Sequence, residues 1–366
     1  MILDRISILN FKNIEEAGLS FSPKMNCFFG NNGMGKTNLL DALYYLSFTK
    51  NHTNLLDSQL IKHEQDFCVL QGFYCEGETA EEIYCGIKRK QKKVFKRNKK
   101  EYERLSDHIG LIPLVMISPS DSDLIHGGSD ERRKFADMLI CQCDKEYLHA
   151  LIRYNKALHQ RNCLLREAPD STDASLFEVL EEQLIHEGET VYNKRKEFIT
   201  DFIPVFKEYY RTIADESEPV DLQYDSQLNS APFAQWFADR REKDKLLGYT
   251  GAGIHKDDFH FLLENYLIRK IGSQGQCKTY LIALKLAQFN FLVRKKSTFP
   301  ILLLDDIFDK LDAGRVEQII RLLLQPEFGQ IFITDTNRKY LDEILEGLNH
   351  DYKLFRVNGG IINEWQ

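Results

Sequence analysis

The sequence contains no apolar run that approaches the length of about 18 residues needed to cross a bilayer as a helix. Residues 1–6 also carry charges too early for a secretory signal peptide. We therefore expect a cytoplasmic protein that has no membrane partner.

The eight cysteines form no C-x-x-C pair and no spacing typical of a zinc site. Their scatter indicates reduced thiols and argues against a zinc-binding or disulfide-stabilised scaffold. Internal repeats and a low-complexity tail are also absent, and the heptads are too few and irregular for a long coiled coil. This excludes a chromosome-structural ATPase of the condensin type, which needs long heptad segments.

Basic residues are fewer than acidic ones, and the formal net charge is −7. This excess does not exclude a nucleic-acid partner, because a local basic surface makes the phosphate contacts. The chain of 366 residues is 43% hydrophobic and 28% charged, as in an ordinary soluble globular protein. Its length suits two or three lobes.

Residues 30–37 read G-N-N-G-M-G-K-T, which matches the phosphate-binding pattern G-x-x-x-x-G-K-[ST]. An apolar run precedes them, and Leu39, Leu43 and Leu46 follow at helical spacing. Glycines let the backbone amides face phosphate oxygens at a helix N-terminus, where Lys36 can reach the β- and γ-phosphates and the Thr37 hydroxyl can bind Mg²⁺. The alternative is a glycine-rich turn before an ordinary helix. We expect a nucleoside triphosphate to contact Gly30, Asn31, Asn32, Gly33, Met34, Gly35, Lys36, Thr37 and Asn38.

Residues 301–306 form an apolar strand that ends in two carboxylates, a Walker B pattern. Asp305 is expected to hold Mg²⁺, and Asp306 to act as the catalytic residue that polarises the attacking water, with Lys36 neutralising the phosphates. Asp306 could instead cap a helix.

A third motif, G-S-Q-G-Q-C-K-T at residues 272–279, opens a helix and is a second candidate anion site. Its predicted nucleotide contacts are Ser273, Gly275 and Gln276. The structural alternative is that Ser273 caps this helix, and the two roles can coexist.

Hydrophobic periodicity predicts three segments, 1–117, 118–216 and 217–366. The first reads as strands of an ATPase lobe. The second reads as a helical insertion that can form an antiparallel hairpin. Its helices begin near Ser129, which can cap the first of them, near Asp144 and near Ala174, with a break or kink at Pro204. The third alternates strands and helices: strand 259–263, helix 276–294, strand 300–305, helix 315–324, strand 330–334, helix 338–348 and strand 353–357.

Nine of the thirteen residues from 88 to 100 are basic, and their flanks look like the strands of a hairpin. One interpretation is a solvated hairpin whose lysines protect a sheet edge; the other is a surface that contacts DNA phosphates. The candidate contacts are Lys88, Arg89, Lys92, Lys93, Lys96 and Arg97. The helical insertion offers a second basic surface, whose members could instead pair with acidic neighbours: Arg132, Arg133, Lys134, Arg153 and Arg161.

The order of these motifs resembles that of ATP-binding-cassette ATPases, in which the serine motif completes the nucleotide site of a partner subunit. Further motifs resemble the RecF family of bacterial recombinational-repair ATPases over nearly the whole chain. They are N-F-K-N at 10–13, S-P at 118–119, R-R-K-F at 132–135, Y-N-K-A-L-x-x-R-N-x-L-L at 154–165, G-I-H-K-D-D-F at 253–259 and L-D-x-x-R at 311–315.

The resemblance implies an α/β fold: an ATP-binding-cassette ATPase head, with mixed and antiparallel sheets around the phosphate-loop core, and an inserted α-helical lobe. It implies a weak, DNA-stimulated ATPase that forms an ATP-dependent homodimer on double-stranded and gapped DNA. Its implied partners are RecR with RecO, through which it helps to load RecA, and slow hydrolysis is the implied release step. The alternatives are a transporter ATPase subunit, which would leave the basic hairpin unexplained, and a DNA clamp that does not hydrolyse ATP.

The sequence departs from the family patterns at several points. In the serine motif, Gln274 stands where transporter ATPases have glycine. Lys256 and Lys278 stand where arginine is usual; lysine keeps the positive charge but cannot donate two parallel hydrogen bonds to one carboxylate or phosphate as arginine can. Residues 334–336 include no histidine, so a switch histidine is not expected. The loop after Ser118 has no glutamine, so the glutamine that is typical of ATP-binding-cassette sites cannot be assigned to a position in this sequence.

Overall fold

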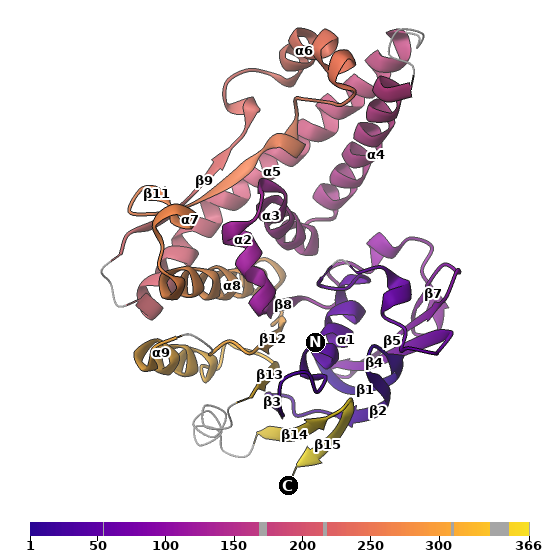
Figure 1. The fold of residues 1–366 in the computed structure, drawn as a ribbon, viewed down its shortest axis with the longest axis vertical. Coiled ribbons are helices and arrows are strands. Elements are labelled where there is room, and N and C mark those ends of the chain that lie inside the picture. Colours follow the sequence, from indigo (N-terminus) through magenta and orange to yellow (C-terminus); the bar gives the residue numbers. More distant parts are fainter. Residues whose placement is uncertain (54, 168–173, 215–217, 309–310, 337–350, 366) are drawn as a thin grey trace. The chain divides into compact units, whose positions relative to one another are not determined.

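The computed structural model describes residues 1–365 apart from 54, 168–173, 215–217, 309–310 and 337–350. The chain divides into two compact units (Figure 1). The first, here the sheet unit, comprises Met1–Asp121, Thr212–Asp215 and Gln274–Gln366. The second, here the helical unit, comprises Ser122–Arg211 and Glu216–Ser273.

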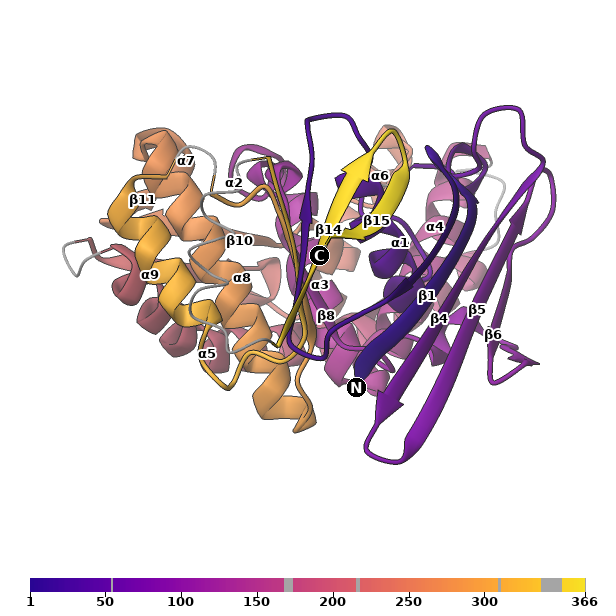
Figure 2. The ribbon, with the colours of Figure 1, turned by 90° about the horizontal axis from the view of Figure 1, so that it is seen from below.

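Within its described residues, the sheet unit contains an antiparallel sheet of strand order β2-β1-β4-β5-β6-β7. Figure 2 shows β1, β4, β5 and β6 side by side. Alternate residues of β4 and β5 are buried, as expected for a sheet that covers a core with one face. The strands are β1 (Ile2–Phe11), β2 (Ile14–Ser20), β4 (Phe67–Glu76), β5 (Thr79–Lys88), β6 (Val94–Arg97) and β7 (Lys100–Glu101).

A second sheet of the same unit has the order β15-β14-β3-β13-β12-β8, in which every pair but β15–β14 is parallel. The residues of β8, β12 and β13 are all buried, which explains their continuous apolar sequences. The strands are β3 (Met25–Phe29), β8 (Leu114–Ile117), β12 (Ile301–Asp305), β13 (Ile331–Asp335), β14 (Tyr352–Asn358) and β15 (Ile361–Trp365).

Helix α1 (Lys36–Phe48) contacts strands of both sheets, so the two sheets and this helix share one core. Four phenylalanines extend that core: the rings of Phe28 and Phe355 stack at 4.8 Å, and those of Phe21 and Phe332 meet edge to face at 4.9 Å. Helix α8 (Gln274–Lys296) packs against β8, and α9 (Ala313–Leu323) follows β12.

The helical unit has a small antiparallel sheet of order β11-β10-β9. Two ion pairs join α4 to α5: Arg153 with Glu187, and Arg161 with Glu181. The later residue of α4 pairs with the earlier residue of α5, so the two helices run in opposite directions and form an antiparallel hairpin, as predicted. The elements are α2 (Ser122–His126), α3 (Ser129–Cys143), α4 (Lys145–Glu167), α5 (Ala174–Ala214, whose last three residues group with the sheet unit), β9 (Val220–Asp225), α6 (Phe233–Leu247), β10 (Asp258–Leu263), β11 (Tyr266–Leu267) and α7 (Ile268–Ile271).

Three details differ from the sequence-based expectations. Helix α5 continues through Pro204 without the predicted break, because its neighbours Phe202 and Phe206 are fully buried and their packing outweighs the lost amide bond; a kink there stays a prediction. Ser129 is the first residue of α3 and Gly128 is the cap, so the predicted serine cap is wrong. Residues 217–273 of the third predicted segment group with the helical unit.

The predicted strands and helices between 259 and 335, and the strand at 353–357, are confirmed within two residues at each end. The predicted helix at 338–348 lies outside the described residues.

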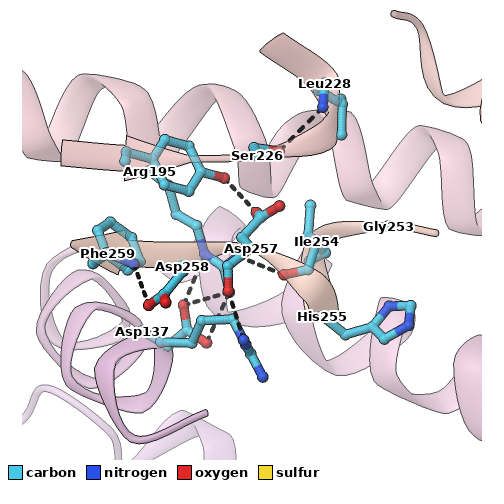
Figure 3. A network of polar contacts seen from close by, with 12 residues as sticks. Asp137, Arg195, Ser226, Leu228, Gly253, Ile254, His255, Asp257, Asp258 and Phe259 are labelled. Atoms are coloured by element: carbon cyan, nitrogen blue, oxygen red, sulfur yellow. Dashed lines mark hydrogen bonds and ion pairs between the residues drawn. The ribbon is translucent and has the colours of Figure 1, made fainter. Parts of the chain in front are cut away.

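The G-I-H-K-D-D-F motif and α5 meet in a buried ion-pair cluster of the helical unit (Figure 3). Arg195, which is 1% exposed, donates two hydrogen bonds to Asp137 Oδ1, at 2.9 and 3.0 Å. Its Nη1 donates to Asp257 Oδ2 and to the Ile254 carbonyl, both at 2.9 Å. This single guanidinium therefore joins α3, α5 and the loop before β10.

We expect Arg195→Met to lower the free energy of unfolding by about 3–5 kcal/mol, because it leaves the buried carboxylate of Asp257 and the half-buried one of Asp137 without their cation. Denaturant unfolding of the full chain measures this change. Lys207→Met is the matched control: Lys207 lies on the same helix, but its ion pair with Asp221 is largely exposed, so its loss should cost at most about 1 kcal/mol. Equal costs for the two variants would contradict a stabilising role of the cluster.

Candidate nucleotide-binding site

The phosphate loop leaves β3 after Phe29 and enters α1 at Lys36. Gly33 and Gly35 have φ angles of 78° and 108°, a left-handed conformation that favours glycine. The Lys36 ammonium is 2.8 Å from the Gly30 carbonyl and 3.2 Å from the Asn31 carbonyl, so it lies across its own loop. The amides of the first turn of α1 point out of the helix N-terminus, which is a ready site for a phosphate.

Two segments distant in sequence hold this loop in place. Asn13 Nδ2 donates to the Met34 carbonyl at 3.3 Å and its Oδ1 accepts from Asn38 Nδ2 at 2.8 Å. The amide of Gly360, in the turn between β14 and β15, donates to the same Met34 carbonyl at 2.9 Å. Asn13 belongs to the N-F-K-N motif, but neither its contact with the loop nor that of Gly360 was predicted from the sequence. A Gly-Gly pair between two apolar strands was the available signal for the turn.

Thr37 and Asp305 lie together, as the sequence analysis predicted for a metal site. The Thr37 hydroxyl donates to Asp305 Oδ2 at 2.8 Å, and the Thr334 hydroxyl donates to Oδ1 at 2.6 Å. Burial raises the pKa of Asp305, and the two hydroxyls oppose this shift by stabilising the charged form. Thr334 lies at the end of the strand predicted at 330–334, and no role was predicted for it.

This donor set fits Mg²⁺. It is made of hard oxygen atoms, and it supplies one carboxylate and one hydroxyl, which suits an ion that keeps several waters and shares the phosphates of a nucleotide. No group of three or more His, Cys, Asp or Glu side chains arranged for a metal ion occurs among the described residues. Oxygen atoms of the nucleotide and water would complete the coordination of the ion.

Asp306, the predicted catalytic residue, follows Asp305 in a left-handed conformation with φ of 46°. Its amide donates to the Thr334 carbonyl at 3.2 Å, which fixes the chain as it leaves the sheet. This conformation is uncommon for a residue other than glycine and is found at functional sites.

The three predicted nucleotide contacts of the serine motif lie where the chain passes from the helical unit to the sheet unit. Ser273 is exposed as the last residue of the helical unit, whereas Gly275 and Gln276 are half-buried in the first turn of α8 in the sheet unit. Their contact with a nucleotide stays a prediction. Residues 309–310, which follow the Walker B strand, lie outside the described residues.

The six predicted DNA contacts differ in their surroundings. Lys88, Arg89 and Lys92 are exposed, and Lys96 is half-buried with its ammonium 5.5 Å from the ring centre of Tyr84. Two others are engaged within the protein: Lys93 donates to the Thr49 carbonyl at 2.6 Å, and Arg97 forms a bidentate pair with Glu81.

The basic residues of the helical insertion are engaged as well, as the alternative interpretation proposed. Arg133 donates to the Ser129 hydroxyl and the Asp257 carbonyl, and the other four form ion pairs. These pairs are Arg132–Asp258, Lys134–Glu131, Arg153–Glu187 and Arg161 with both Glu181 and Asp244.

Comparison with known proteins agrees with this geometry. Residues 2–363 match the RecF/RecN/SMC N-terminal domain family. A DNA replication and repair protein RecF of Azobacteroides pseudotrichonymphae is 66% identical, and the alignment covers 100% of both chains. The RecF of Parabacteroides distasonis is 64% identical over 98% of both chains.

The chain belongs to the RecF family. A solved structure of the recombination mediator protein RecF with ATP, from the RecFOR pathway, is 27% identical and superposes with a TM-score of 0.89 over 100% of this chain and 98% of that chain. An Smc head bound to a domain of ScpA shares the fold alone, at 14% identity and a TM-score of 0.59, with 100% of this chain and 97% of that chain covered.

The fold of this RecF-family protein is therefore the predicted one, an α/β ATP-binding-cassette ATPase head with an inserted helical lobe. The family also connects the chain with DNA replication and repair and with recombination. Within the described part of the chain, every helix is too short or too polar to cross a membrane.

The β14–β15 turn offers a test of how the loop is held. A Cβ atom on Gly360 would lie 2.3 Å from the Asn13 carbonyl oxygen, and Gly360 has φ of 85°. We expect Gly360→Ala to push the turn off the phosphate loop, to destabilise the protein by about 2 kcal/mol or more, and to weaken nucleotide binding about 10-fold. Calorimetric titration with ATP and thermal unfolding measure the two effects.

Gly359 is the matched control, because it has φ of 59° but a Cβ atom there would have no neighbour within 4 Å. Gly359→Ala should cost only about 1 kcal/mol of backbone strain and leave nucleotide affinity unchanged. If both variants bind ATP as the wild type does, the turn does not hold the loop.

Proposed function

We propose that this RecF-family protein binds ATP with Mg²⁺ at the phosphate loop and hydrolyses it slowly, with stimulation by DNA. The observation that carries the proposal is the meeting of Lys36, Thr37 and Asp305 at one end of the parallel sheet. A RecF relative has been solved with ATP, which supports the choice of nucleotide.

Each residue has a distinct role in this proposal. Lys36 exchanges its bonds to loop carbonyls for bonds to the β- and γ-phosphates, and Thr37 and Asp305 hold Mg²⁺. The metal ion, when bound, neutralises phosphate charge. Asp306 orients and polarises the attacking water.

We infer further that ATP joins two copies of the chain face to face. Ser273, Gly275 and Gln276 of one copy then complete the site of the other, as the signature serine does in related cassettes. An exposed Ser273 beside the N-terminus of α8 is compatible with this role, since a helix N-terminus favours phosphate.

The proposed setting is recombinational repair in the cytoplasm. The ATP-bound dimer would hold double-stranded DNA at single-strand gaps and, with RecR and RecO, help to place RecA, while hydrolysis releases the dimer. The description of a relative as a mediator in the RecFOR pathway supports these partners.

Three variants test the nucleotide cycle. Lys36→Met should weaken ATP binding about 10–100-fold, since it removes charge-assisted bonds to phosphate. Ser273→Arg should bind ATP almost normally but fail to dimerise, because a bulky cation would meet the partner's site. Asp306→Asn should bind ATP, dimerise and accumulate as a dimer, since only the water-polarising group is lost.

Titration calorimetry, analytical ultracentrifugation with ATP and phosphate release distinguish these outcomes. Wild-type ATP affinity in the Lys36→Met protein would contradict the site. A wild-type protein that dimerises on DNA without any phosphate release would instead support a non-hydrolysing clamp.

For the DNA surface, we propose the basic turn, residues 88–92, which joins β5 to β6. Among the described residues, Lys88, Arg89, Lys90 and Lys92 are exposed and form no ion pair, so their charges are not neutralised within the protein. This distinguishes the basic turn from the helical insertion, in which four of the five cations are paired with carboxylates.

We expect replacement of Lys88, Arg89, Lys90 and Lys92 by Gln to flatten the slope of log DNA affinity against log salt by roughly one unit for each DNA phosphate that the variant no longer binds. ATP affinity should not change. Arg97→Gln is the control from the same hairpin; because Glu81 already neutralises Arg97, the slope should stay near that of the wild type. Fluorescence anisotropy with a gapped duplex at several salt concentrations gives the slopes. An unchanged slope in the quadruple variant would show that the basic turn does not bind DNA.

A further inference from the structure

Thr334 is a polar residue in a strand where packing alone would favour an apolar one. It lies in β13 among Ile331, Phe332 and Ile333, and its side chain is completely buried. A valine has almost the same shape and would fill the same space. A buried hydroxyl is costly unless it is hydrogen-bonded, so its bonds are the feature to explain.

The hydroxyl of Thr334 contacts both acidic residues of the proposed active site. Parallel pairing of β12 with β13 places Thr334 directly beside Asp305. The hydroxyl donates to Asp305 Oδ1 at 2.6 Å and accepts a bond from the Asp306 amide at 3.3 Å. The Asp306 amide also donates to the Thr334 carbonyl at 3.2 Å.

These bonds fix two orientations. The Thr334 hydroxyl donates to Asp305 Oδ1, and the Thr37 hydroxyl lies 2.8 Å from Oδ2 and 3.1 Å from Oδ1. Rotation of the carboxylate would therefore break the bond from Thr334. Asp306 has a left-handed backbone conformation, with φ of 46°. The hydrogen bond from its amide to Thr334 helps to fix this conformation.

We propose that Thr334 is a positioning residue, which orients the Asp305 carboxylate for Mg²⁺ and holds the backbone turn that aims Asp306 at the attacking water. This inference rests on the proposed ATPase function. Groups that hydrogen-bond to a metal ligand typically contribute about 10–100-fold to metal affinity or activity. Thr334 would act in this way without touching either the metal ion or the nucleotide.

Thr334→Val and Thr334→Ser form the matched pair for the test. Val keeps the shape and removes the hydroxyl, whereas Ser keeps the hydroxyl and removes a methyl group. We expect Val to raise the Mg²⁺ concentration for half-maximal turnover about 10-fold and to lower kcat about 10-fold. Ser should restore most of both values. Nucleotide affinity measured in EDTA should change less than about 2-fold in either variant, since phosphate binding by Lys36 does not involve Thr334.

A second measurement does not depend on turnover. Mn²⁺ binding in the presence of ADP, followed by electron paramagnetic resonance, should weaken about 10-fold in Thr334→Val and stay near the wild type in Thr334→Ser. In an Asp305→Asn background, Thr334→Val should add little to the loss of Mn²⁺ affinity, because the two groups act together. Thermal unfolding without nucleotide checks that the variants are folded; should Val not fold, Thr334→Ala, which also removes the hydroxyl, is compared with Thr334→Ser in its place.

The outcomes separate this inference from the proposed function. If the wild type turns over ATP and Lys36→Met does not, but Thr334→Val matches the wild type in Mg²⁺ requirement and Mn²⁺ affinity, the positioning role is wrong and the ATPase function stands. If Ser is as defective as Val, the methyl group and packing are responsible, which also overturns the inference. A wild type that binds no nucleotide would overturn the proposed function itself.

Discussion

The buried carboxylate of Asp305 is the group on which the arrangement of the site depends. A carboxylate in a sheet interior is costly unless other groups stabilise its charge, and here two hydroxyls from two other segments do so. One comes from the first turn of α1 and the other from β13, so the carboxylate ties the phosphate loop to the strand that follows the Walker B strand. Parallel pairing of β12 and β13 makes this possible, because it brings the carboxyl ends of both strands to one edge of the sheet.

The basic residues of this chain fall into two groups: some pair with carboxylates within the protein, and others have no such partner among the described residues. Arg161 and Arg195 are fully buried, and each is surrounded by carboxylates from different elements. Such clusters favour one arrangement of the helices, since any other would leave a buried charge alone. The basic turn has the opposite character: its cations have no acidic partner among the described residues, although the net charge of the whole chain is negative.

The sequence predicted features that local residues determine. The phosphate loop, its helix and the Walker B strand each depend on a short run of residues, so their pattern could be recognised without tertiary information. The supports from Asn13, Gly360 and Thr334 could not be recognised, because each acts through a contact with a segment distant in the chain. For the same reason the sequence could not decide whether Arg97 and the cations of the insertion face solvent or a carboxylate. Pro204 shows the limit of local rules, since the burial of neighbouring phenylalanines keeps the helix intact.

Lys93 places a positive charge at the C-terminal end of helix α1. Its ammonium binds the Thr49 carbonyl at the C-terminus of α1 and the Tyr45 hydroxyl in the last turn, where the helix dipole is negative. The N-terminus of the same helix, where the dipole is positive, faces the phosphate loop. Because α1 has 13 residues, it is a rod about 20 Å long. Lys93, which directly follows the basic turn, and the phosphate loop thus lie at opposite ends of one helix, so the length of this helix sets the distance between them.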